Sequence, residues 1–112
     1  MKIIMKAVVV SLLILSSFYA NAEITIKQYK KFQNEDAIKF YVKGLGVAYS
    51  WANVEMDANG KKPLYCQPPK LALGMDNYLR LLDDAIVEYS PKDDDVIEYL
   101  LLMQLKKVFP CK

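Results

Sequence analysis

Two cysteine-containing segments decide the fold, Pro63-Leu64-Tyr65-Cys66-Gln67-Pro68-Pro69 and Lys107-Val108-Phe109-Pro110-Cys111. Cys66 and Cys111 are the only cysteines in the sequence, and each lies just outside an apolar helical pattern. This placement suggests one disulfide that ties the start of a helical hairpin to its end. Two free thiols or a redox pair are the alternatives, although a redox pair is typically a C-x-x-C motif.

Residues 1–22 have the pattern of a secretory signal peptide. Lys2 and Lys6 give the start a positive charge, and Ala7–Leu15 is apolar apart from one serine. Ala20-Asn21-Ala22 then forms a small-x-small cleavage site. The rival interpretation is a membrane anchor, but the apolar run is shorter than the roughly 20 residues that a membrane-spanning helix needs. We therefore expect cleavage, with no membrane span afterwards.

The expected mature chain is a single domain of residues 23–112 in the periplasm. Loss of Lys2 and Lys6 lowers the lysine and arginine count from 15 to 13, which equals the 13 aspartates and glutamates. A nucleic-acid binder normally carries a basic patch, so this class is not expected. Cysteines normally pair in an oxidising compartment. A 66–111 bridge would be worth roughly 4 kcal/mol by the chain-entropy model.

Hydrophobic periodicity predicts helices at 25–33, 35–58, 75–89 and 96–109. Thr25 and Asn34 are the predicted N-caps of the first two. The fold class is therefore all-α, a small compact bundle of about four helices closed by one disulfide.

The second predicted helix carries a wide apolar face. Its core-facing set is expected to include the flanking stripe Phe40, Val47, Trp51 and Val54. Gly44 and Gly46 lower its helix propensity. They either permit the close approach of another helix or mark a kink.

The last predicted helix is apolar most of the way round, and such a helix has to be covered on most sides. A homodimer would cover the excess surface. Tyr99, Leu102 and Met103 are the candidate dimer interface. The alternative is a central helix that the other three surround.

Residue types exclude most catalytic chemistry. The sequence contains no histidine, which removes Ser-His-Asp and Cys-His catalysis and the usual zinc sites. No Gly-rich phosphate loop is present. Asp93, Asp94 and Asp95 are consecutive, whereas calcium ligands are spaced around a loop, so these residues are expected to cap the last helix. We expect no catalytic residue, no metal and no cofactor.

Charge is unevenly distributed along the domain. From Asp76 to Glu98 there are eight acidic residues against Arg80 and Lys92, which could steer a basic partner. The alternative is that this face only maintains solubility. The candidate partner-binding residues are Asp83, Asp84, Glu88, Ser90, Lys92, Asp93, Asp94 and Asp95.

A family resemblance rests on three groups of residues. These are Leu64-Tyr65-Cys66-Gln67-Pro68-Pro69, the Ser90-Pro91 turn after a tyrosine- and leucine-rich helix, and Phe109-Pro110-Cys111. Over roughly residues 37–111 the sequence resembles the Rap/Tai family of type VI secretion system amidase immunity proteins. Tyr41-x-x-Gly44, followed by Gly46, Ala48 and Tyr49, resembles the first long helix of that family.

The resemblance implies a small, mostly helical periplasmic protein, often a homodimer, with a disulfide between Cys66 and Cys111. Its expected partner is a secreted peptidoglycan amidase effector, which it binds and blocks to protect the producer and its kin. The sequence departs from the expected pattern at Gly74, where a capping Ser or Thr would stand. Two alternatives stay open, an acid-activated periplasmic chaperone and a structural subunit of an envelope complex.

Overall fold

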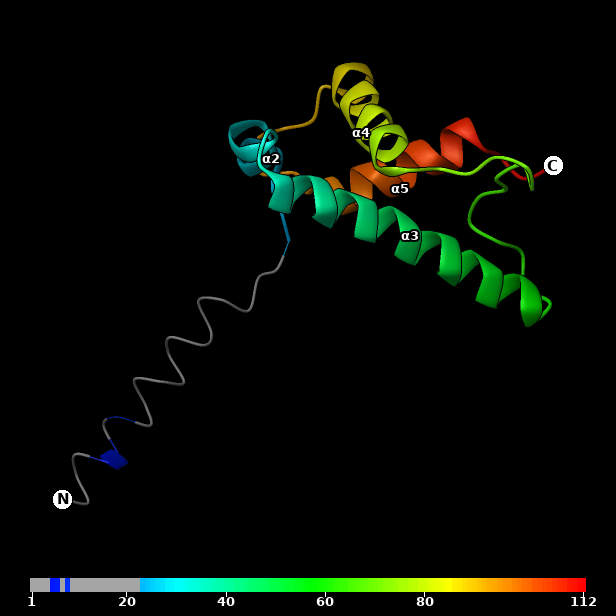
Figure 1. Cartoon of the computed structure of the whole chain (residues 1–112), viewed down its shortest axis with the longest axis horizontal. Helices are drawn as coiled ribbons and strands as arrows, with labels where there is room; N and C mark the ends of the chain where they lie inside the picture. The colour runs from blue at the N-terminus through cyan, green and yellow to red at the C-terminus, as the bar shows by residue number, and fades with distance from the viewer. Residues whose placement is uncertain (1–4, 7, 9–22) are drawn as a thin grey trace.

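The computed structural model describes residues 5, 6, 8 and 23–112, so the predicted signal peptide lies almost wholly outside the described residues. Residues 23–112 form four helices: α2 (Ile26–Phe32), α3 (Asp36–Ala58), α4 (Met75–Tyr89) and α5 (Ile97–Val108). The described chain contains no strand, only an isolated bridge between Thr25 and Val96. Cys66 and Cys111 form a disulfide. The predicted all-α fold is confirmed (Figure 1), and so is its one disulfide.

Local sequence explains some helix starts and not others. Thr25 caps α2 in a capping box, because its Oγ1 accepts the Gln28 N–H while Gln28 Oε1 accepts the Thr25 N–H. The N-cap of α3 is Glu35, one residue after the predicted Asn34, and no side chain caps it. The N-cap of α5 is Val96, also without a side-chain cap. The prediction that the three aspartates 93–95 cap α5 is therefore wrong.

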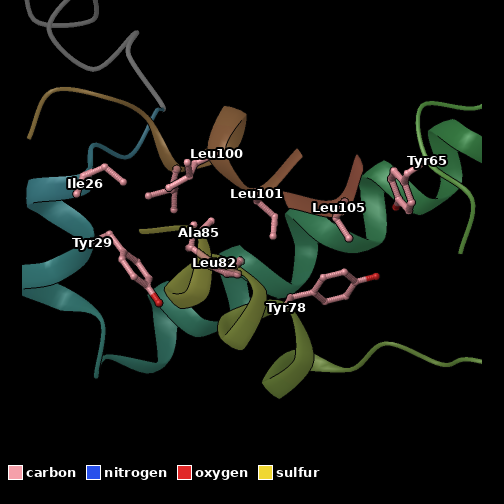
Figure 2. Packing of buried hydrophobic residues seen from close by; sticks show 11 residues of the cluster. Ile26, Tyr29, Tyr65, Tyr78, Leu82, Ala85, Leu100, Leu101 and Leu105 are labelled. Atoms are coloured by element: carbon pink, nitrogen blue, oxygen red, sulfur yellow. The ribbon is translucent and has the colours of Figure 1, made fainter. Parts of the chain in front are cut away.

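α5 is the central helix of the bundle. It packs against α4 and α3, and α2 closes one end of the core. Side chains from α2, α4 and α5 converge in Figure 2, with Tyr29 and Tyr65 towards opposite ends of the cluster. The buried residues of α5 include Ile97, Leu101 and Leu105. The other side of α5 keeps Tyr99 exposed and Leu102 and Met103 half-buried, so burial by the other helices accounts for only part of its apolar character.

The loop between α3 and α4 is held at two points. Asn53 is buried, its Oδ1 accepts the Leu64 N–H at 2.9 Å, and its Nδ2 donates to the Tyr65 carbonyl at 3.0 Å. The Cys66 N–H donates to the Phe109 carbonyl at 2.8 Å beside the disulfide. Figure 1 shows the C-terminus next to this loop. The loop is therefore fastened to α3 on one side and to the chain end on the other.

Candidate protein-binding surface

The segment between α4 and α5, residues 90–96, begins with a sharp reversal. α4 ends at Tyr89, and Ser90 follows with φ 44°, in the left-handed region. This conformation is uncommon for a residue other than glycine. The Ser90 N–H still donates to the Ile86 carbonyl at 3.1 Å, which closes the helix, and Pro91 prevents its continuation. The chain therefore turns away from α4 over a very short distance.

Backbone hydrogen bonds fasten this segment to α2. The Ile26 N–H donates to the Asp95 carbonyl at 2.8 Å, and the Lys27 N–H donates to the Asp93 carbonyl at 3.1 Å. The first N–H groups of a helix have no partner within the helix, so these two carbonyls satisfy donors that α2 would otherwise leave free. The Ile97 N–H also donates to the Ile24 carbonyl at 2.9 Å. The 90–96 segment is consequently held in one conformation.

Several predicted partner-binding residues already have partners within the protein. Asp95 Oδ2 accepts the Lys92 N–H at 2.8 Å, which holds the turn rather than capping α5. Asp83 Oδ1 accepts the Tyr29 hydroxyl at 2.7 Å. Glu88 forms an ion pair with Lys107, with Oε2 and Nζ 2.6 Å apart. These three carboxylates are less available to another protein than the sequence indicates.

The remaining acidic residues lie in two different places. Asp93 and Asp94 are exposed on the 90–96 segment, and within residues 23–112 their carboxylates have no hydrogen bond or ion pair. Asp84 instead lines a separate hollow of about 200 Å³ beside Arg80 and Phe109. The structure therefore divides the predicted acidic surface, and only the aspartates of the segment stay together.

A partly apolar groove lies beside that segment. Its volume is about 280 Å³. The groove, called the α5 groove below, is lined by Tyr89, Pro91, Asp95, Val96, Tyr99, Leu100 and Met103. It brings together one residue predicted to bind a partner, Asp95, and two of the residues predicted to form a dimer, Tyr99 and Met103. Leu102 is half-buried and does not line it.

A second apolar surface was missed by the sequence reasoning. Phe40, Val47, Trp51 and Val54, called the α3 stripe below, are exposed, with Phe40 and Trp51 exposed to 62% and 68%. Their spacing places them along one side of α3. The prediction that they belong to the core-facing set is wrong, because the core takes the opposite side through Val42, Gly46 and Asn53. The sequence did carry a signal for this exposed surface, because apolar residues occur on both sides of the helix.

Charges flank the α3 stripe asymmetrically. Lys39 and Lys43 lie along its N-terminal half, and Glu55 and Asp57 lie along its C-terminal half. Val54 and Asp57 also line a hollow of about 460 Å³ between α3 and the 63–69 loop. The stripe thus ends at a hollow beside the disulfide.

Within the described part of the chain, no three His, Cys, Asp or Glu side chains gather as a metal site would require. None of the described helices is both long and apolar enough to cross a membrane. Comparison of the chain with protein-family models, with curated proteins and with solved structures found no match.

Proposed function

We propose that this chain is a periplasmic immunity protein that binds and inhibits a peptidoglycan amidase delivered by type VI secretion, protecting the producer and its siblings. The amidase as target comes from the sequence resemblance at both cysteines. The observation that carries the binding role is the 90–96 segment, whose backbone is fastened to α2 while the Asp93 and Asp94 carboxylates stay free. The disulfide agrees with an exported protein.

The proposed mechanism is steric occlusion without catalysis. A segment that is already ordered loses little conformational entropy on binding, which favours tight association. Its two free aspartates steer a basic surface of the amidase towards the α5 groove. The groove then receives an apolar or aromatic side chain of the amidase, as the centres of protein interfaces commonly do.

We also propose a homodimer, formed through the α3 stripe rather than through α5. Tyr99 and Met103 line the groove assigned to the amidase, so they are unsuited to hold a second copy at the same time. In an antiparallel α3 pair centred on Val47, Lys39 of each copy lies opposite Glu55 of the other, and Lys43 lies opposite Trp51. The same register places Phe40 of one copy at Val54, beside the 460 Å³ hollow.

The amidase proposal is tested with the processed, oxidised protein isolated from the periplasm after expression of the full chain. Mixed with candidate secreted peptidoglycan amidases at neutral pH, it should bind one of them stoichiometrically and stop its cleavage of peptidoglycan. Replacement of both Asp93 and Asp94 by Lys should abolish inhibition, whereas the matched Asp84→Lys variant should inhibit normally. Inhibition that survives the double replacement, or no inhibition of any amidase, contradicts the proposal.

The chaperone alternative makes a different prediction in the same assay. It expects binding of many unrelated unfolded proteins, growing as the pH falls to about 2 to 3 and carboxylates become protonated.

For the dimer, light scattering should give twice the monomer mass, and Trp51→Glu should give a monomer. Tyr99→Glu is the matched control and should leave the dimer intact. A Tyr99→Glu protein that is monomeric, together with a Trp51→Glu protein that stays dimeric, would assign the dimer interface to α5.

A further inference from the structure

The Glu98 carboxylate, in the first turn of α5, collects hydrogen bonds from two distant parts of the chain. Its Oε1 accepts the Ile24 N–H at 2.8 Å and the Tyr41 hydroxyl at 2.7 Å. The backbone carbonyl of Glu98 accepts the Tyr49 hydroxyl at 2.7 Å. One residue therefore fastens the start of the domain and α3 to the central helix.

This carboxylate has an unsatisfied oxygen. Glu98 Oε2 is buried and has no hydrogen-bond partner. Within the described part of the chain, the one ion pair joins Lys107 and Glu88, so no lysine or arginine compensates Glu98. A buried, unpaired charged oxygen is costly, and such a group calls for a partner.

We propose that the leader is removed after Ala22 and that Glu23 then carries a free α-ammonium group, which forms an ion pair with Glu98 Oε2. This inference rests on the export proposed above. The maturation cleavage thus creates the missing partner of a buried carboxylate. In the uncleaved chain the Glu23 nitrogen is a neutral amide and supplies no charge. Only the processed protein adds a charged N-terminus to the hydrogen bonds that already join this segment to α5.

Chain geometry places this ammonium within reach. The Glu23 nitrogen precedes the Ile24 nitrogen by one residue, at most about 3.6 Å along the chain. The Ile24 nitrogen is itself 2.8 Å from Glu98 Oε1. Besides Glu98, the titratable groups that act on the Tyr41 hydroxyl beside this position are Tyr49 of α3 and the Glu23 side chain. The surroundings are therefore acidic or neutral, which favours a cation.

The experiment begins with the full chain, expressed with its own leader and isolated from the periplasm. Mass spectrometry should show Glu23 as the first residue. The pKa of its α-amino group, measured from the pH dependence of acetylation at that nitrogen, should lie at least about one unit above the usual 7.7 to 8.0. A raised pKa stabilises the fold fully below about pH 7.7, and this stabilisation is lost as the pH rises through the raised value.

Two variants complete a double-mutant cycle. One inserts an alanine between Ala22 and Glu23, which moves the ammonium up to about 3.6 Å away. The other is Glu98→Gln, which keeps an oxygen for the Ile24 and Tyr41 hydrogen bonds but removes the charge. Each alone should return the α-amino pKa to its usual range, and the two together should change it no further.

The possible failures are distinguishable. A chain that is not cleaved, or is cleaved at another residue, overturns the ion pair and the export on which it rests. A protein cleaved at Glu23 whose α-amino group titrates at 7.7 to 8.0, or keeps a raised pKa in Glu98→Gln, overturns the ion pair alone. The amidase proposal then still stands or falls on its own assay.

Discussion

The ring of Tyr78 in α4 lies against the backbone of Gly46 in α3, so closely that a Cβ atom on Gly46 would overlap the ring. Tyr78 is 2% exposed, and Gly46 is buried. Gly44, in the same helix, faces open space, with nothing within 4 Å of its Cβ position. Of the two alternatives for these glycines, a close helix approach holds at Gly46 and does not hold at Gly44.

Gly46→Ala should lower the free energy of unfolding by about 1–3 kcal/mol, because the added methyl group overpacks the α3–α4 contact. Gly44→Ala, the matched control, should raise it by about 0.5–1 kcal/mol, because alanine loses less conformational freedom in a helix. Urea unfolding of both variants measures the two values. Equal effects at the two positions would contradict the assigned contact.

Removal of the disulfide by Cys66→Ala with Cys111→Ala should cost roughly 4 kcal/mol in the chain-entropy model, because the bridge closes a loop with a sequence separation of 45. The α3–α4 loop is affected most, since the bridge lies beside its hydrogen bond to Phe109. Urea unfolding with and without a reductant measures the loss. The double variant is its own control and should not respond to the reductant, whereas the native protein should fall to its level.

The helices and the disulfide were predictable from the sequence for definite reasons. The α3 and α4 patterns are long and periodic, and a glycine or proline follows the end of each, Gly60 after α3 and Pro91 after α4. Thr25 was predictable as a cap because Gln28 stands three residues later and completes the capping box. Two cysteines leave one possible intramolecular bridge.

The candidate surface was predictable only in part. Composition located the acidic residues, but Asp83, Glu88 and Asp95 bind groups that are distant in sequence or that belong to a turn, which no local pattern reveals. The α3 stripe was missed because periodicity identifies an apolar face without saying which of two faces the core uses. Central placement of α5 depended on how α3 and α4 cover it, a property of the assembled bundle.

Asn53→Ala should lower the free energy of unfolding by about 2–6 kcal/mol, because it leaves the Leu64 N–H and the Tyr65 carbonyl without a partner, and each such loss costs about 1–3 kcal/mol when buried. Hydrogen exchange at the Leu64 amide should become faster by more than the lower free energy of global unfolding explains. Asn59→Ala, at an exposed amide in the same region, is the control and should cost less than about 1 kcal/mol. A Leu64 amide that stays protected would contradict the role of Asn53.

Stability should fall in alkali because several tyrosines resist ionisation in the folded state. Burial raises the pKa of Tyr65 to about 12. Burial first, and then the hydrogen bond to Glu98, raises the pKa of Tyr41 to about 12. Unfolded tyrosines lose their protons near pH 10. The folded state therefore holds more protons above pH 10, and its stability is complete below that pH and declines up to about pH 12.

Two variants separate the causes of these raised pKa values. Tyr65→Phe should leave stability at pH 7 equal or slightly higher, because its buried hydroxyl has no partner to lose. Tyr41→Phe should lose about 1.5–3 kcal/mol at pH 7 with its hydrogen bond to the Glu98 carboxylate. Between pH 10 and 12 each should reduce the decline by about 1.4 kcal/mol per pH unit, the contribution of one proton. Urea unfolding across pH 7 to 12 measures both, and a Tyr65→Phe protein that declines as steeply as the native one would show that this hydroxyl ionises in the folded state.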